Sequence, residues 1–192
     1  MALKLLTTNV HKAAEFSRIG LPAEVCKALP YAEAGEPKQV AAHKALALPE
    51  GIVVEVTSLT VEGFRVNAPI PEVLKAVRSA AAGTKGVKEP KAVWLSAVAY
   101  HAEGVLYTAQ AQLSGRLLSA SISPSEGFDG SFVPDGLGWT LAMLEREGLK
   151  DTLSPRKDAV RRLLEGKAGK TDLSSVPFVS RQYRPAKDFV VA

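Results

Sequence analysis

The residues best suited to chemistry stand near the start of the chain, where an apolar run leads into a polar turn. Thr7 and Asn9 follow the run, and Lys12 comes one turn into a helical pattern. Free backbone N–H groups at a helix start, with the positive end of the helix dipole, bind anions. A lysine one turn later can reach the same anion, so this spacing suits a phosphate. The alternative is an ordinary capped helix with a solvated lysine.

Several other kinds of site are excluded by spacing. His11, His43 and His101 are far apart in the sequence, and no Cys/His cluster has the spacing of a zinc site. The chain has neither a Gly-x-Ser-x-Gly nucleophile elbow nor a Walker phosphate loop. The single cysteine, Cys26, cannot form an internal disulfide and is expected to be a buried apolar residue of a cytosolic protein.

The polar turn, Thr7 to Glu15, resembles the opening motif Thr-Gly-Asn-x-x-Lys-x-x-Glu of the inosine triphosphate pyrophosphatase family. Three further segments follow in the family's order. Residues 52–62 match an apolar strand with an acidic pair, residues 127–134 match a Gly-Tyr-Asp-Pro-x-Phe loop, and residues 153–159 match a Ser-His-Arg helix start. Together they cover residues 2–166, and the chain is identified as a divergent member of the family.

The resemblance implies a Mg²⁺-dependent hydrolase that cleaves non-standard purine nucleoside triphosphates, of the inosine and xanthosine type, to the monophosphate and pyrophosphate. It also implies a homodimer. Carried over by position, the resemblance implies that Thr7, Asn9 and Lys12 contact the triphosphate. The purine- and phosphate-side contacts would be Phe128, Asp129, Ser154 and Arg156. The catalytic and Mg²⁺-binding carboxylates would be Glu55 and Glu36.

The chain departs from the family mainly on its acidic side. The second residue of the acidic pair is Val56, which can neither ligate a metal nor accept a proton. Thr8 stands where the family has glycine, and Pro155 stands where it has histidine. Thr57-Ser58 replaces the family's Ser-Gly. Gln39 stands where the family has a glutamate on the second helix, although Glu36 lies one turn away. Three hypotheses remain open: a rewired hydrolase, a nucleotide-binding homologue that has lost hydrolysis, and a structural homologue whose pocket is closed by Val56 and Pro155.

The elements that must position these residues alternate in the first half of the chain, which favours an α/β fold with a long, twisted mixed sheet flanked by helices. Two lobes with a central nucleotide cleft are expected. Strands are predicted at 2–7, 24–28, 51–56, 59–64, 92–101, 104–113 and 116–123, the last three joined by turns at Glu103-Gly104 and Ser114-Gly115. Helices are predicted at 9–19, 37–48, 72–82, 140–147 and 154–165.

Length and composition agree with this class of fold. The 192 residues, 46% of them hydrophobic, suffice for a single α/β domain with a C-terminal tail from about 170 to 192. No segment resembles a signal peptide or a membrane span, so a cytoplasmic protein is expected. The net charge of +4 suits an anionic small molecule, and no motif supports nucleic-acid binding.

Overall fold

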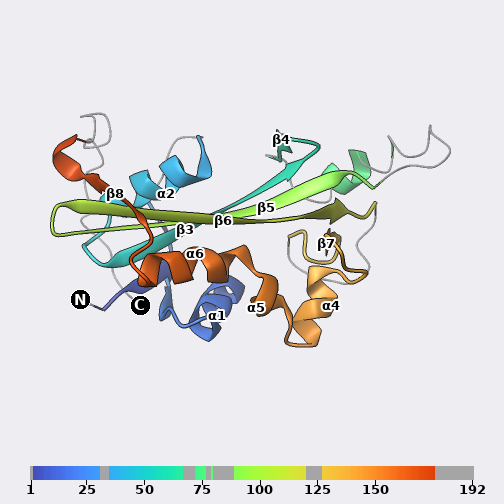
Figure 1. Ribbon diagram of the computed structural model, residues 1–192, viewed down its shortest axis with the longest axis horizontal. Helices are drawn as coiled ribbons and strands as arrows, with labels where there is room; N and C mark the ends of the chain where they lie inside the picture. Colours follow the sequence, from blue (N-terminus) through green and yellow to red (C-terminus); the bar gives the residue numbers. More distant parts are fainter. Residues whose placement is uncertain are drawn as a thin grey trace. The chain divides into compact units, whose positions relative to one another are not determined.

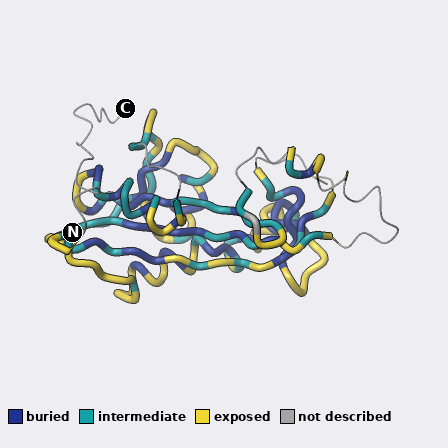
Figure 2. The backbone as a smooth tube through the Cα atoms, turned by 90° about the horizontal axis from the view of Figure 1, so that it is seen from above, coloured by how far each residue is buried: buried dark blue, intermediate teal, exposed yellow. Residues whose placement is uncertain are grey.

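A computed structural model describes residues 2–30, 35–66, 72–76, 79, 89–119 and 127–175. Its centre is one eight-stranded mixed sheet with the strand order β2-β1-β3-β5-β6-β7, while β4 pairs with β3 and β8 with β6 (Figure 1). The predicted mixed α/β fold is therefore confirmed. Buried backbone follows the middle of the sheet, and exposed backbone follows many of the connections (Figure 2).

The N-terminal part alternates strands and helices: β1 (Lys4–Thr7), α1 (Val10–Arg18), β2 (Ala23–Val25), α2 (Pro37–Leu46) and β3 (Ile52–Val61). Both β2 and β3 run parallel to β1, one on each side of it. Because the crossover from β1 to β2 and the crossover from β2 to β3 run in opposite directions across the sheet, α1 and α2 cover opposite faces of it, and α6 shares the face of α1 (Figure 1).

The remaining strands are mostly antiparallel. They are β4 (Phe64–Arg65), β5 (Lys91–Ala102), β6 (Val105–Leu117), β7 (Phe132–Pro134) and β8 (Gly169–Asp172). β7 and β8 both pair antiparallel with β6, at opposite ends of that strand. β8 was not predicted, because its run of small and charged residues lacks the apolar alternation of a strand.

Three helices follow β7, and the chain ends its described part in a short 3₁₀ helix. These elements are α4 (Leu141–Arg146), α5 (Lys150–Leu153), α6 (Pro155–Leu164) and η1 (Leu173–Ser175). Thr140 caps α4 by accepting a hydrogen bond from the Met143 N–H, as expected for a threonine before an apolar helix. α5 is a single turn and was not predicted.

The chain divides into two compact units. Unit 1 comprises residues 1–57, 96–111 and 155–192, and unit 2 comprises residues 58–95 and 112–154. Each unit has its own buried core. The core of unit 1 includes Leu5, Phe16, Leu21, Val53, Val98, Val160 and Leu163, and that of unit 2 includes Leu59, Trp94, Leu117, Phe132, Leu141 and Leu144. The single-domain organisation with a central cleft stays a prediction.

Two predicted breaks in the strands are wrong. β3 continues through the polar residues Thr57 and Ser58, where two strands were predicted. β6 continues through Gly115, where a turn was predicted. At Gly115 a Cβ atom would lie 2.3 Å from the Val133 carbonyl oxygen and 2.8 Å from the Phe132 ring, so glycine permits a close approach of β7 rather than a turn.

Parts of some predictions lie outside the described residues. Residues 72–76 are helical, whereas most of the rest of the helix predicted at 72–82 is not described. The C-terminal tail is described only as far as residue 175. Within the described residues, no helix has the length and apolar character needed to cross a membrane.

We expect the substitution Gly115→Ala to destabilise the protein by about 1–3 kcal/mol, because the added methyl group collides with backbone and with an aromatic ring that is fully buried. Urea unfolding measures the loss. Gly138→Ala is the matched control, since nothing lies within 4 Å of the Cβ position there. Equal unfolding free energies for the two variants would contradict the close-approach role of Gly115.

Candidate active site

The candidate site lies at the carboxyl end of β1, beside the first half of the longer strand β3. The register pairs Leu5 with Val53, so two residues further on Thr7 stands opposite Glu55. In open α/β sheets ligands bind outside the carboxyl ends of the parallel strands. The motif that predicts phosphate binding, at the end of β1, and the acidic residue of β3 therefore meet at one place in unit 1.

The start of α1 is organised by two predicted site residues. The Thr7 Oγ1 accepts a hydrogen bond from the Asn9 N–H at 3.2 Å, and the Asn9 Oδ1 accepts one from the Lys12 N–H at 2.9 Å. Asn9 is the N-cap residue, as its position before the helical pattern predicts. In this conformation both side chains stabilise the turn that precedes Lys12. Their contacts with a phosphate stay a prediction.

Glu55 is the centre of the site, and its side chain is 0% exposed. Its Oε2 lies 2.6 Å from the Lys12 Nζ. Its Oε1 accepts hydrogen bonds from the Thr57 hydroxyl at 2.8 Å and the Ser96 hydroxyl at 2.9 Å. Thr57 is two residues along the same strand, so the pleat puts both side chains on one face. Both carboxylate oxygens are thus already in close polar contact.

The carboxyl group of Glu55 is held in its ionised form. Burial by itself raises the pKa, because a charge is removed from water. The positive charges of Lys12 and Arg156, with hydrogen bonds from Lys12 and Thr57, outweigh burial and lower the pKa of Glu55 to about 2. The site therefore keeps a negative charge at neutral pH.

Arg156, the first-turn residue of α6, joins this carboxylate to a second one. Its Nη1 donates to Glu15 on α1, and its Nη2 donates to the Thr57 Oγ1 at 3.1 Å. Its Nε lies 3.6 Å from the Glu55 Oε1. Because Thr57 has one hydroxyl proton, which it gives to Glu55, it can accept from the guanidinium. Two cations and two carboxylates thus form one charge-balanced network.

A further cation, Lys44 of α2, stands within electrostatic range of this network. Its half-buried position lowers the pKa of Lys44, the positive charge of Lys12 lowers it further, and Glu55 opposes the shift. Lys44 was not predicted as a site residue. Its signal was weak, because a lysine in the last turn of a helix is the usual complement of the helix dipole.

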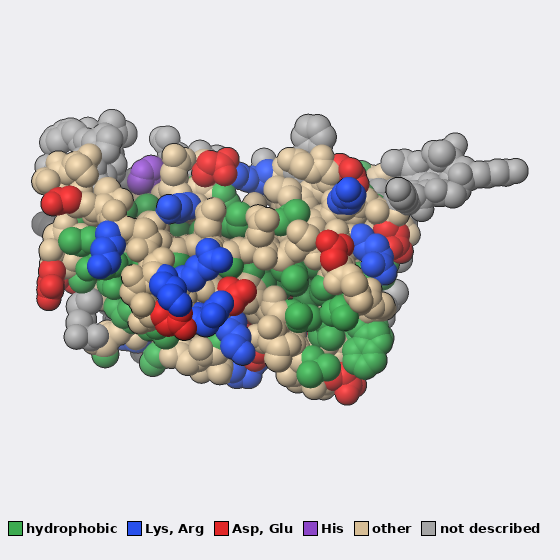
Figure 3. All heavy atoms as spheres, in the orientation of Figure 1, with side chains coloured by type: hydrophobic (Ala, Val, Ile, Leu, Met, Phe, Trp, Pro, Cys, Tyr) green, Lys and Arg blue, Asp and Glu red, His purple; other side chains and the backbone are tan. Residues whose placement is uncertain are grey.

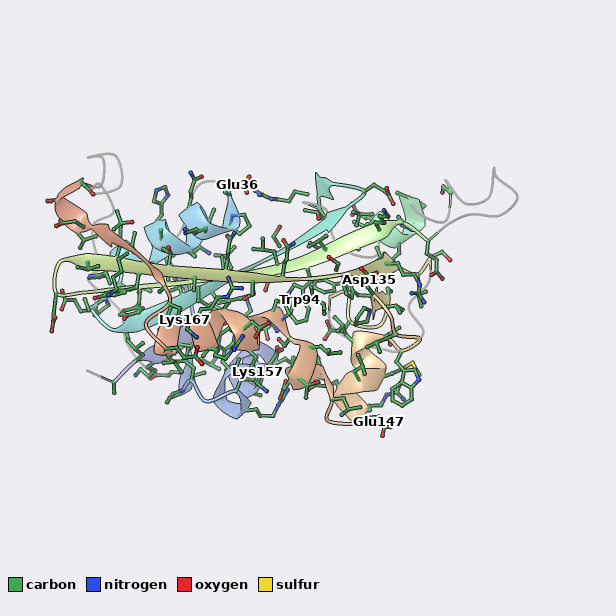
Figure 4. The ribbon with its side chains drawn as sticks, viewed as in Figure 1. Glu36, Trp94, Asp135, Glu147, Lys157 and Lys167 are labelled. Carbon is green, nitrogen blue, oxygen red and sulfur yellow. The ribbon has the colours of Figure 1, made fainter. Side chains whose placement is uncertain are left out.

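Glu36 and Val56 belong to the other face of the sheet. Glu36 is the exposed N-cap residue of α2 and lies on the α2 side (Figure 4). Val56 alternates with Glu55 along β3, so the pleat points its side chain away from α1 and α6. The predicted pairing of Glu36 with Glu55 as metal ligands stays a prediction.

The donor set around Glu55 suits only one mode of Mg²⁺ binding. In the described part of the chain, no three His, Cys, Asp or Glu side chains gather in an arrangement that could hold a metal. A metal held by protein ligands alone does not fit. Mg²⁺ often binds through one or two carboxylates and the phosphates of its substrate. Glu55 fits that second mode once Lys12 has moved away.

The predicted purine contacts of unit 2 lie beside a buried tryptophan. The half-buried ring of Phe128 packs edge-on against Trp94 at 5.7 Å and tilted against Phe132 at 5.8 Å. The Asp129 Oδ2 accepts a hydrogen bond from the Lys150 Nζ at 2.6 Å, and that ammonium also lies 5.8 Å from the Trp94 ring centre. Trp94 is labelled in Figure 4.

Two residues of these groups, Lys150 and Glu15, were not predicted as site residues. Lys150 of unit 2 is buried, although it stands in a short polar stretch that looks like a surface loop. Glu15 of unit 1 stands in the opening motif, three residues after Lys12 and so on the same side of the helix. Ser154, which was predicted, is buried at the C-terminal end of α5. The structure thus groups Lys12, Glu55 and Arg156 in unit 1, and Phe128 and Asp129 in unit 2.

Stability should depend on pH through Glu55. Since its folded-state pKa of about 2 lies below the ordinary glutamate value of 4.5, its ionisation stabilises the fold above pH 4.5, and this stabilisation is lost as the pH falls towards 2. Glu55→Gln should lower the unfolding free energy at neutral pH by about 3 kcal/mol, because it leaves buried cations without their anion. Urea unfolding at several pH values should show the difference from wild type shrinking below pH 4.5. A difference that stays constant down to pH 2 would contradict the assignment.

Lys150→Met should destabilise unit 2 by about 1–3 kcal/mol, because it leaves Asp129 without its cation. Adding Asp129→Asn to this variant should restore part of the loss, since Asp129 then no longer carries a charge that lacks its nearest cation. Chemical denaturation measures both effects. Lys157→Met, which changes an exposed lysine, is the control, and a loss as large in the control would show that the buried pair is unimportant.

The chain was compared with known proteins and structures. The profile of the Ham1 family matches residues 3–166. Among curated proteins no match was found. One similar solved structure is a protein described as a nucleoside-triphosphatase and dITP/XTP pyrophosphatase, from Mycobacterium abscessus. Its TM-score is 0.55 at 23% identity, over 84% of this chain and 99% of that one.

Two Ham1 proteins of known structure are also similar. The protein from Coxiella burnetii has a TM-score of 0.60 at 17% identity, over 86% of this chain and 98% of that one. The protein from Staphylococcus aureus has a TM-score of 0.61 at 18% identity, over 85% and 99%. At these identities the structures establish the fold alone. The profile covers most of the chain, however, and so confirms what the four sequence motifs predict: the chain belongs to the Ham1 family, the family of inosine triphosphate and dITP/XTP pyrophosphatases.

Proposed function

We propose that the protein hydrolyses non-standard purine nucleoside triphosphates, of the inosine and xanthosine type, to the monophosphate and pyrophosphate. The observation that carries this proposal is the grouping of Lys12, Arg156 and the ionised Glu55 beside the carboxyl end of β1, with Glu55 in the first half of β3. Family membership supplies the substrate class. Phe128, Asp129 and Ser154 are retained as the proposed purine-side contacts.

The proposed reaction begins with an exchange of partners at Lys12. The side chain of Lys12 is 19% exposed and its ammonium contacts Glu55, whereas a triphosphate offers several anionic oxygens. When Lys12 moves to a phosphate, it neutralises charge that builds up during phosphoryl transfer. The same movement frees the Glu55 Oε2, which can then ligate Mg²⁺ that arrives with the nucleotide. Bound there, the metal would polarise the phosphate that water attacks.

The distribution of charge favours an anionic ligand on this part of unit 1. Residues 155–170 carry a net charge of +4, which equals the net charge of the whole chain. Lys and Arg side chains gather on the face that Figure 3 shows, where α6 lies in front. Such a field raises the encounter rate of a charged substrate. The contributing residues are Arg156, Lys157, Arg161, Arg162, Lys167 and Lys170, against Asp158 and Glu165.

The test is pyrophosphate release from inosine, xanthosine and the standard nucleoside triphosphates, with Mg²⁺ and with a chelator. We expect Mg²⁺-dependent release that is fastest for the two non-standard purines. Lys12→Met and Glu55→Gln should each slow release by about 100-fold or more, because each removes a charge at the reacting phosphates. The matched control is Asp158→Asn, which neutralises an exposed carboxylate on α6.

Release that is equally fast in the wild type and in Glu55→Gln would remove Glu55 from the mechanism. No release by folded wild-type protein, with every substrate and with Mg²⁺ present, would reject the hydrolase proposal.

A second candidate is a nucleotide-binding homologue without turnover, and Val56 favours it. The residue stands where the family has its second carboxylate, and a lost general base typically costs about 10²–10⁴-fold in rate. This candidate requires saturable nucleotide binding, weakened by Lys12→Met, without pyrophosphate release.

The homodimer and the cytoplasmic location belong to the same proposal and rest on the family resemblance. A measurement of molar mass by sedimentation or light scattering tests whether the protein is a homodimer.

A further inference from the structure

The two cations around Glu55 are held very differently. Lys12 meets Glu55 through one flexible ammonium on a side chain that water partly reaches. Arg156 contacts Glu15, Thr57 and Glu55 through three different nitrogens of a planar group. Several contacts in one plane fix an arginine far more firmly than one contact fixes a lysine. A phosphate could therefore draw Lys12 away from Glu55 more easily than it could draw Arg156 away.

We propose that Glu15 is a positioning residue that keeps Arg156 against Thr57 and Glu55, so that Lys12 alone exchanges to the phosphates. In this arrangement Arg156 is the resident counter-charge of Glu55 rather than a contact of the nucleotide. The assignment differs from the role that the family motif gives Arg156. This division of labour, in which Lys12 moves to the phosphates and Arg156 stays beside Glu55, rests on the proposed function. The positioning of Arg156 by Glu15 does not.

Burial makes Glu15 suited to this role. It is 2% exposed although it is charged, and a buried carboxylate is stable only beside a cation. Glu15 lies on α1 and Arg156 on α6, so their contact joins the two helices on one face of the sheet. If Arg156 left for a phosphate, Glu15 would stay buried without this partner. This cost opposes the release of Arg156.

The same geometry explains how Glu55 remains ionised during the exchange. When Lys12 leaves, Glu55 keeps Arg156 nearby and the hydroxyl groups of Thr57 and Ser96 as donors. A buried carboxylate that lost both cations together would be destabilised. Glu15 thereby prevents the two cations from leaving as a pair.

The first test needs no nucleotide. Side-chain ¹⁵N NMR compares hydrogen exchange at the Arg156 guanidinium in the wild type and in Glu15→Gln, with Arg161 as internal reference because it is 56% exposed and pairs with Asp158. We expect exchange at Arg156 to be at least about tenfold slower than at Arg161 in the wild type. Glu15→Gln should abolish most of that difference, while the control Asp158→Asn should leave Arg156 unchanged.

Equal exchange at Arg156 and Arg161 in the wild type would overturn the proposal, and this comparison stands even if Glu15→Gln fails to fold. So would unchanged protection of Arg156 in a folded Glu15→Gln variant. These results do not depend on whether the protein hydrolyses nucleotides.

The second test applies where the wild type releases pyrophosphate. Because Arg156 would support the carboxylate and not the nucleotide, Glu15→Gln should lower kcat by about tenfold or more at nearly unchanged KM. In an Arg156→Gln background, Glu15→Gln should have no further effect on kcat. A raised KM at unchanged kcat would place Arg156 on the nucleotide and overturn the division of labour. Failure of the wild type to release pyrophosphate rejects the proposed function, and the exchange measurement alone then decides the role of Glu15.

Discussion

The burial of a charged Glu55 is the constraint on which the arrangement of unit 1 depends. A carboxylate without access to water is costly unless cations and hydrogen-bond donors surround it. The chain meets this requirement from four elements: Lys12 on α1, Thr57 on β3, Ser96 on β5 and Arg156 on α6. Each partner comes from a different part of the chain, so forming this one site requires much of unit 1 to be assembled correctly.

The same constraint would link stability to the proposed function. Lys12 and Arg156 neutralise Glu55, which stabilises the fold. In the proposed function, a nucleotide would bring negative charge for the lysine and, with it, a metal for the carboxylate. The ion pair can therefore be replaced without leaving a buried charge uncompensated, provided that one cation stays behind. The buried contact between Glu15 and Arg156 meets that condition.

Much of the fold could be predicted because local signals and tertiary packing agree. Asn9 caps α1 as expected, and the apolar run at Ile52 begins the central strand. The errors arose where a local signal has a non-local cause. Gly115 resembles a turn residue, but it is required by the approach of Phe132 from another strand. No inspection of the neighbouring sequence could show that contact.

Three residues of the candidate site could be singled out from the sequence, whereas their contacts could not. Lys12, Glu55 and Arg156 stand in recognisable motifs, yet nothing in those motifs indicates that Lys12 and Arg156 both contact Glu55. Thr57 shows why. As a departure from the family's Ser-Gly it looked like erosion of the site, whereas its hydroxyl connects Arg156 to Glu55. Val56 is different. Because side chains alternate along a strand, Val56 lies on the opposite face of β3 and takes no part in this network. The loss of an acid at Val56 and the integrity of the Glu55 network are therefore separate matters, and an intact network is compatible with either turnover or binding alone.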